Sequence, residues 1–215
     1  MFHVFDIFRG GVIIEVGNTK ESAIAEASGA VALLLAAEES PIAPDGNDVS
    51  MKEILNSSHI PLLTSFRPGH KVEAEILYNI GAWGLYEDSR YEPLLLNSQE
   101  IHSEYPCLSD VVTLEGVETN TPVVLRGDSL EFLSEELAKK EDGQYVFVSG
   151  PIETVSDIAF LKRAGADVII LSRSVFDYAD SRTYIPRLIE ASFYYDNPQK
   201  LSTLFRAEVP EEGVK

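Results

Sequence analysis

Short apolar runs alternate with helix-like stretches along almost the whole chain of 215 residues, and this alternation constrains the fold more than any other feature. The run at residues 30–36 (AVALLLA) is apolar at every position. A continuous apolar run of this length is typical of a strand that is buried on both faces of a parallel sheet. Parallel neighbours require a crossover connection, usually a helix. The alternation therefore predicts an α/β protein.

Eight strand–helix units can be placed along the chain. We expect strands at residues 11–16, 30–36, 61–66, 82–87, 107–113, 122–126, 145–149 and 167–171. We expect helices at residues 19–28, 50–57, 70–80, 97–101, 129–140, 154–164 and 184–195. The fifth unit is irregular, because residues 114–120 are too few for an ordinary barrel helix. Eight units predict a single (β/α)8 barrel of the TIM type. We expect this one domain to span residues 1–206, with an acidic, disordered tail at 207–215.

Charge and cysteine content exclude several classes of protein. The net charge of −18 argues against nucleic acid or an anionic membrane as a partner, because both repel an acidic surface. Cys107 is the only cysteine, so no intramolecular disulfide can form. The chain does not begin with a basic region leading into an apolar run, and no run is long enough to span a bilayer. We therefore expect a cytoplasmic protein.

Charged residues follow several predicted strands, at the end where parallel barrels bind their ligands. Glu15 and Glu87 come at the ends of the first and fourth apolar runs. Both are candidate acid–base groups, because burial there would raise a carboxyl pKa toward neutral. Glu15 is either a residue of the barrel mouth or a salt-bridge partner at the end of its strand. Arg67 and His70 flank a Pro-Gly turn. They form either a phosphate- or carbonyl-binding turn or an ordinary helix start.

The loops after the seventh and eighth strands occupy positions where many barrels bind phosphate through backbone N–H groups. Their sequences are Ser-Gly-Pro at 149–151 and Ser-Arg-Ser at 172–174. Proline lacks an N–H donor and serine permits a less close approach than glycine, whereas arginine adds charge. The sequence leaves phosphate binding open. The candidate residues are Ser149, Gly150, Ser172, Arg173, Ser174 and, from the sixth strand, Arg126.

Lysines are absent from the predicted strand ends. The chain has eight lysines, none of them within a predicted strand or immediately after one. A Schiff-base lysine needs a desolvated pocket. Lys20 and Lys71 alone could reach the mouth, and we expect both to be solvated. His3, His59 and His102 read as isolated surface or packing residues. No nucleophile elbow, Walker loop, or zinc or iron–sulfur ligand cluster is recognisable, so we expect neither metal nor cofactor.

An ordered set of motifs resembles the synthase subunit of pyridoxal 5′-phosphate synthase. That family makes the cofactor from ribose 5-phosphate, glyceraldehyde 3-phosphate and ammonia, which a partner glutaminase supplies, and it assembles into hexameric rings and double rings. The resemblance is poorest after Asp88. The motifs are Gly10-Gly-Val-Ile-Ile-Glu-Val16, residues 21–36, Ile60-Pro61, Arg67-Pro-Gly-His70, residues 72–81 with Glu87, and residues 147–156 and 164–176.

The departures from this family fall on its chemistry. Ser65 stands where the resemblance implies the first imine-forming lysine, and Gly-Asp-Ser at 127–129 stands where it implies the second. Glu15 and Tyr86 replace two aspartates. The glycine-rich phosphate loops are also altered. From the resemblance we expect the helix that docks the glutaminase to be at best reduced to residues 2–9 and most of the family's long C-terminal tail to be missing.

These departures leave three hypotheses. The leading one is a divergent, non-catalytic homologue that acts as a binding or assembly module. It would form its own hexameric ring or double ring, or join an authentic synthase subunit, and the reduced helix argues against glutaminase docking. The first alternative is an enzyme with altered chemistry on a small sugar phosphate. The second is residual pyridoxal 5′-phosphate synthase (lyase) activity through a relocated lysine, Lys20 or Lys71.

Overall fold

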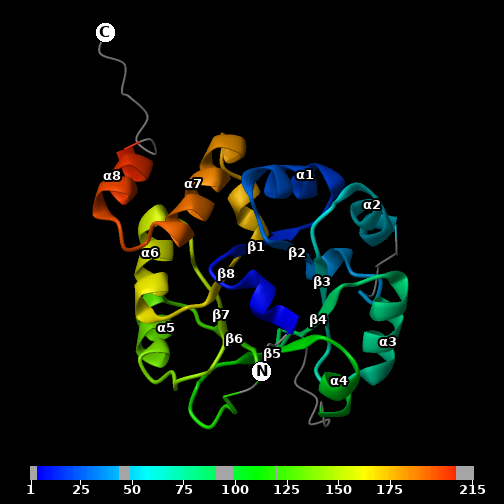
Figure 1. The fold of residues 1–215 in the computed structure, drawn as a ribbon. Coiled ribbons are helices and arrows are strands. Elements are labelled where there is room, and N and C mark those ends of the chain that lie inside the picture. Colours follow the sequence, from blue (N-terminus) through cyan, green and yellow to red (C-terminus); the bar gives the residue numbers. More distant parts are fainter. Residues whose placement is uncertain (1–3, 44–48, 91–98, 120, 207–215) are drawn as a thin grey trace.

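The computed structural model describes residues 4–43, 49–90, 99–119 and 121–206. Within them, eight parallel strands close into a barrel in sequential order (Figure 1). The prediction of a single (β/α)8 barrel is confirmed, and the tail predicted at 207–215 lies outside the described residues. The strands are β1 (Val12–Val16), β2 (Ala32–Leu35), β3 (Leu62–Phe66), β4 (Gly84–Glu87), β5 (Cys107–Val111), β6 (Val123–Arg126), β7 (Val146–Ser149) and β8 (Val168–Leu171).

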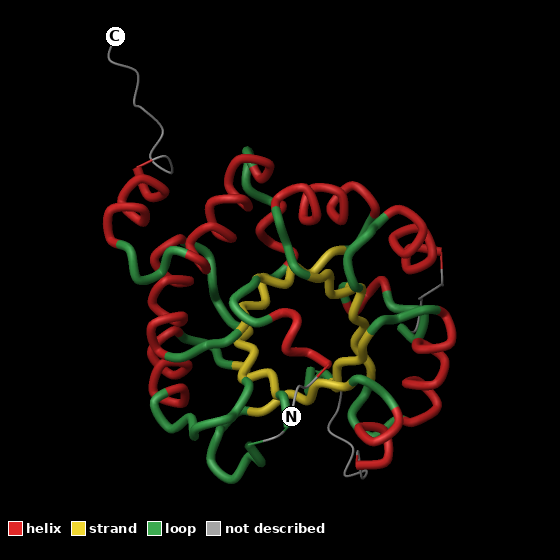
Figure 2. Tube along the Cα trace, in the orientation of Figure 1, coloured by secondary structure: helices red, strands yellow, loops and turns green. Residues whose placement is uncertain are grey.

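Helices surround this barrel as an outer ring (Figure 2). They are α1 (Thr19–Ser28), α2 (Val49–Ser57), α3 (Lys71–Ile80), α4 (Gln99–Glu104), α5 (Leu130–Leu137), α6 (Val155–Ala164), α7 (Ser181–Phe193) and α8 (Pro198–Arg206). Three short 3-10 helices are η1 (Val4–Phe8), η2 (Ala37–Glu39) and η3 (Arg173–Phe176). Between β5 and β6 the described residues contain no helix, as the irregular fifth unit predicted. Neither α8 nor the 3-10 helices η2 and η3 were predicted, whereas η1 lies within the helix remnant expected at residues 2–9.

Local sequence signals fix the ends of several helices. Thr154 caps α6 by accepting a hydrogen bond from the backbone N–H of Asp157, whose carboxylate accepts one from the N–H of Thr154 in return. This reciprocal pair satisfies two N–H groups that the first turn leaves without helical partners. Gly165 ends the helix at a φ of 114°, a left-handed conformation that favours glycine. The chain is thereby returned directly to β8.

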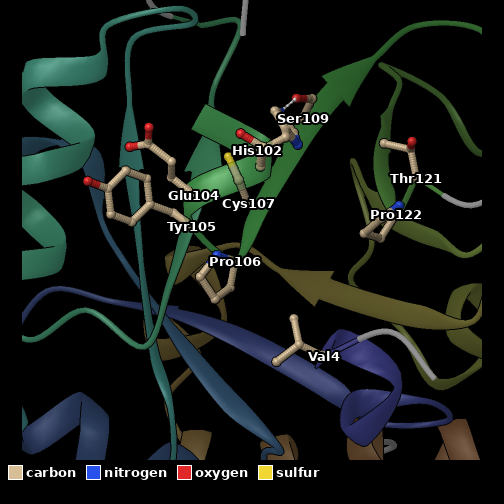
Figure 3. A pocket seen from close by; sticks show the side chains of 10 residues that line it. Val4, His102, Glu104, Tyr105, Pro106, Cys107, Ser109, Thr121 and Pro122 are labelled. Atoms are coloured by element: carbon tan, nitrogen blue, oxygen red, sulfur yellow. Dashed lines mark hydrogen bonds between the residues drawn. The ribbon is translucent and has the colours of Figure 1, made fainter. Parts of the chain in front are cut away.

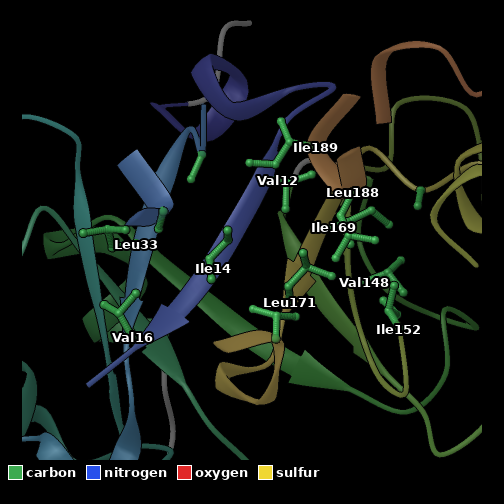
Figure 4. Close-up of a cluster of buried hydrophobic side chains, with 14 of the residues drawn as sticks. Val12, Ile14, Val16, Leu33, Val148, Ile152, Ile169, Leu171, Leu188 and Ile189 are labelled. Carbon is green, nitrogen blue, oxygen red and sulfur yellow. The ribbon is translucent and has the colours of Figure 1, made fainter. Parts of the chain in front are cut away.

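Side chains alternate along each strand between the barrel interior and the surrounding helices. Figure 4 shows part of the outer set, in which Val12 of β1 lies near Ile189 of α7, and Ile14 and Val16 follow along the same strand. The inner set is a separate cluster that includes Ile13, Leu34, Leu63, Tyr86 and Phe147. Because the period is two, a residue's position in its strand decides whether it can reach the barrel mouth.

The short helix η1 closes the amino-terminal end of the barrel and crosses the ring of strands in Figure 2. Phe5 and Phe8 are buried and belong to the inner cluster. The Phe5 ring lies edge-on to Trp83 at 5.7 Å and to Phe147 at 6.0 Å, between ring centroids. The Tyr145 hydroxyl donates a hydrogen bond to the Phe5 carbonyl at 3.0 Å. Residues 2–9 were expected as the remnant of a docking helix. Within this segment, Val4–Phe8 instead packs two phenylalanine rings into the amino-terminal end of the barrel.

None of the helices in the described ranges is both long enough and apolar enough to cross a membrane.

Candidate functional site

A small cavity opens at the carboxyl ends of the strands and has a volume of about 180 Å³. Its walls combine two guanidinium groups and one carboxylate with hydroxyl and apolar groups. The lining residues are Glu15, Leu34, Arg90, Arg126, Ser149, Gly150, Ile170 and Ser172. This position is the one at which parallel barrels place their active sites.

Ser65 lies in β3 on the inward face of the barrel, two residues after Leu63 of the inner cluster. Its side chain is fully buried, and β3 pairs with β4 so that Ser65 is opposite Tyr86. The Ser65 hydroxyl has no hydrogen-bond partner among the described residues. A buried hydroxyl without a partner costs stability, and it cannot form an imine because it carries no nitrogen.

Asp110 is the centre of a hydrogen-bonded network beside the cavity. Its carboxylate accepts hydrogen bonds from Arg126 Nε at 2.8 Å, from Ser89 Oγ at 2.6 Å and from the Tyr86 hydroxyl. The Arg126 guanidinium also donates to the Tyr86 oxygen. Burial, followed by the charge of Asp110, raises the pKa of Tyr86 well above its ordinary value. The phenol is therefore neutral near pH 7 and serves as a fixed donor.

Asp88 holds the second guanidinium group. Arg90 donates to the two Asp88 oxygens at 2.6 to 3.0 Å and to Glu15 Oε1 at 3.4 Å. Burial alone would lower the pKa of Arg90, but the hydrogen bonds and charge of Asp88 outweigh it and raise the pKa. Three carboxylates thus face two guanidinium groups around the cavity, so this group carries one excess negative charge when all are ionised: Glu15, Asp88 and Asp110 against Arg90 and Arg126.

The loop after β8 has its backbone donors already engaged. The Arg173 N–H donates to Glu15 Oε2 at 3.3 Å, so this carboxylate takes the place that a phosphate oxygen would occupy. The N–H of Ser174 donates to the Ser172 hydroxyl at 3.3 Å. The Arg173 guanidinium turns away from the cavity to Glu21, with its Nε 2.9 Å from Oε2. These two N–H groups are therefore engaged by Glu15 and by the loop itself.

Glu87 does not lie at the mouth, although the sequence placed it there with Glu15. It alternates with Tyr86 and Asp88 and so faces the helices outside the barrel. Its Oε1 accepts the Gly69 N–H at 2.9 Å, and its Oε2 lies 3.0 Å from His102 Nε2. The two predicted acids therefore belong to different sites.

The turn after β3 is also a structural feature outside the cavity. Arg67 donates to Glu73 through its backbone N–H at 3.1 Å and through Nε at 2.6 Å. His70 precedes α3, and its Nδ1 lies 3.7 Å from the same carboxylate. Neither side chain lines the cavity. These contacts are those of a turn that begins helix α3, which was one of the two hypotheses for Arg67 and His70.

The structure brings together five of the ten predicted site residues, namely Glu15, Arg126, Ser149, Gly150 and Ser172. The other five line different parts of the molecule, namely Glu87, Arg67, His70, Arg173 and Ser174. The predicted site residues did not include Asp88, Arg90 or Asp110. Two of these carried a usable signal, because Asp88 and Asp110 are two residues beyond the inward-facing Tyr86 and Leu108.

The described lysines lie away from the cavity. Lys71 Nζ binds Glu100 at 2.5 Å and Glu104 at 2.9 Å, and these hydrogen bonds raise its pKa. Lys20 lines a separate pocket between α1 and α7. Burial lowers the pKa of Lys162 to about 8, but its Nζ donates to backbone carbonyls just before β8, at the opposite end of the barrel. None of the three is placed to attack a ligand in the mouth.

This chain is similar in sequence to one protein family and similar in fold to a solved barrel structure. The SOR/SNZ family model matches residues 3–89. A pyridoxal 5′-phosphate synthase subunit PdxS from Fusobacterium nucleatum is 26% identical over 247 residues, covering 89% of this chain and 88% of the relative. The subunit of the same name from Methanothermobacter thermautotrophicus is 22% identical and covers 95% of this chain and 92% of its own length. The solved structure of thiamine phosphate pyrophosphorylase from Pyrococcus furiosus is similar to this barrel with a TM-score of 0.62. The match is 14% identical in sequence and covers 86% of this chain and 95% of that protein's chain. It supports the fold alone.

Proposed function

We propose that this chain, which is a divergent relative of the SOR/SNZ family, is a non-catalytic homologue of the synthase subunit and acts as a binding or assembly module. One observation carries the proposal. Among the described residues no lysine lines the cavity, and Ser65 is buried in the strand position where the family resemblance implies the first imine-forming lysine. Covalent catalysis through an imine requires a primary amine, and positioning by other groups does not replace it.

The charges around the cavity support the same reading over an enzyme that acts on sugar phosphates. The excess carboxylate repels a phosphate, and Glu15 already holds the Arg173 N–H. A phosphorylated ligand would have to break these contacts and leave buried carboxylates without partners. The cavity volume of about 180 Å³ is also below the range of about 300 to 1,000 Å³ that is usual for ligand pockets.

Incubation with ribose 5-phosphate followed by borohydride is expected to leave the intact mass of this protein unchanged. An authentic synthase subunit treated in parallel should gain the mass of one reduced pentose-phosphate adduct. The reason is that borohydride traps an imine only where a neutral amine has attacked the sugar aldehyde. A stoichiometric adduct on any single lysine, located by peptide mapping, would contradict the proposal. Trace labelling spread over several exposed lysines would agree with it.

The outer surface offers a face for assembly. A groove of about 400 Å³ lies between α6 and α8 and is lined by Phe160, Leu201 and Phe205 among others. Phe160 and Phe205 are 46% and 50% exposed. Large aromatic side chains left exposed in one groove are typical of surfaces that bind another protein. We expect this face to contact a second copy of the chain or an authentic synthase subunit.

Replacing Phe160 with glutamate is expected to weaken that association at least about tenfold, because a charge would be buried in an apolar contact. Native mass spectrometry over a concentration series, with and without an authentic synthase subunit, measures the effect. Val72→Glu is the matched control, since Val72 is 66% exposed on α3, away from the groove. A wild-type chain that stays monomeric and binds no synthase subunit would remove the assembly role.

A further inference from the structure

Between β5 and β6 the described residues contain no helix, and a cavity lies on the outer side of β5. It has a volume of about 520 Å³ and is lined by residues of α4, of β5 and of the chain that enters β6. Figure 3 shows His102, Cys107 and Ser109 next to one another on its wall. The cavity is separate from the barrel mouth, because Cys107 and Ser109 alternate with the inward-facing Leu108.

Three side chains with metal-binding atoms meet at this wall. The carboxylate of Glu87, a ring nitrogen of His102 and the sulfur of Cys107 all lie within 4.8 Å of one another. Glu87 Oε2 is 3.0 Å from His102 Nε2, and Ser109 Oγ is 2.9 Å from the same nitrogen. Glu87 and Cys107 are 3% and 4% exposed, so β4 and β5 hold both ligands firmly. His102 reaches them from α4.

The arrangement differs from a Ser-His-acid triad, although it contains the three residue types. In such a triad the acid binds one ring nitrogen and the serine binds the other. Here Glu87 and Ser109 both approach Nε2 of His102, and the Ser109 hydroxyl donates directly to Glu87 at 2.5 Å. The ring therefore offers no path for proton relay from Ser109 through His102 to Glu87, which argues against a serine nucleophile at this wall.

We propose that Glu87, His102 and Cys107 form a binding site for a divalent transition-metal ion of the zinc type. Zinc takes carboxylate oxygen, imidazole nitrogen and thiolate sulfur together, whereas magnesium and calcium prefer oxygen ligands alone. Ligand atoms around a tetrahedral zinc ion are separated by about 3.3 to 3.5 Å, from bond lengths of about 2.0 to 2.3 Å. The ion therefore requires the Glu87–His102 contact to open by only a few tenths of an ångström from 3.0 Å.

The fourth position of this site faces the cavity. Ser109 Oγ or a water molecule can complete the tetrahedron, since the hydroxyl is already within hydrogen-bond distance of two of the ligands. Binding of a metal ion to the Cys107 sulfur would displace the thiol proton and form the thiolate ligand.

Cobalt titration of the reduced, chelator-treated protein tests the site. Cys107 is the only cysteine, so a thiolate-to-cobalt charge-transfer band in the near ultraviolet can come from no other residue. We expect one equivalent of Co²⁺ to produce that band and one equivalent of Zn²⁺ to abolish it. Cys107→Ser should lose the band, and His102→Ala should bind Co²⁺ at least about tenfold more weakly. His59→Ala is the matched control, because the His59 side chain is 90% exposed and pairs with Glu26.

Circular dichroism of each variant separates lost ligands from lost folding, and the partly exposed His102 gives a variant that is expected to fold. The cobalt titration of the wild-type chain tests the metal site without any substitution. A titration of folded wild-type protein that yields no near-ultraviolet band would overturn the proposal. Equal weakening in His59→Ala and His102→Ala would overturn it as well, because it would indicate binding by surface histidines.

Discussion

Replacing Asp110 with alanine is expected to lower the free energy of unfolding by about 3 kcal/mol, near the lower end of the range for breaking a buried ion pair. The carboxylate accepts hydrogen bonds from Arg126 and Ser89, and from the Tyr86 hydroxyl. Without it, the nearest remaining carboxylate for Arg126 is Asp88, at 3.7 Å. A partly buried guanidinium group and a buried phenol would both lose a partner. Urea unfolding followed by circular dichroism measures the change.

Two further variants separate this network from a general effect of losing a charge. Asp142→Ala removes a carboxylate from an exposed position and should change the free energy of unfolding by no more than about 0.5 kcal/mol. Asp110→Leu combined with Arg126→Met should recover part of the loss, because no buried charge is left without a partner. If Asp110→Ala costs no more than Asp142→Ala, the ion pairs at the mouth do not stabilise the barrel.

The strands could be predicted because most are buried on both faces and so read as continuous apolar runs. Their ends were less accurate: the run at 30–36 yields a strand only at Ala32–Leu35, where its partners β1 and β3 provide hydrogen bonds. The short helix η1 was expected only from the family resemblance, since Val4–Phe8 has too few residues for a periodic pattern. Tertiary packing stabilises η1, because two of its phenylalanines are buried in the amino-terminal end of the barrel.

The site was harder to predict because a displacement of one residue changes the face of a strand. Glu15 is two residues after the inward-facing Ile13 and reaches the mouth, whereas Glu87 is one residue after the inward-facing Tyr86 and does not. The contact of Arg126 with Asp110 depends on the pairing of β5 with β6, which no local pattern reveals. The three proposed metal ligands come from β4, α4 and β5, so their spacing in the sequence resembles no metal-binding motif.

Replacing Phe5 with alanine is expected to cost about 3 to 5 kcal/mol of unfolding free energy, the usual range for a phenylalanine removed from a core. The ring is fully buried, and it contacts Trp83 and Phe147 edge-on. Gly84 permits this packing, since a Cβ at that position would lie 3.3 Å from the Phe5 ring. The inner cluster cannot collapse to fill the space, because the closed ring of strands fixes the barrel radius. Thermal and urea unfolding measure the loss.

The neighbouring Ile7 provides the control within the same short helix. Its side chain is 64% exposed, so Ile7→Ala should change the unfolding free energy by no more than about 0.5 kcal/mol. Phe5→Leu should fall between the two, because leucine refills part of the volume. Equal stability of the Phe5 and Ile7 variants would mean that η1 does not pack into the barrel in solution. A large difference would identify η1 as part of the barrel core, which leaves only the outward side of this helix, including Val4 and Ile7, to contact a partner.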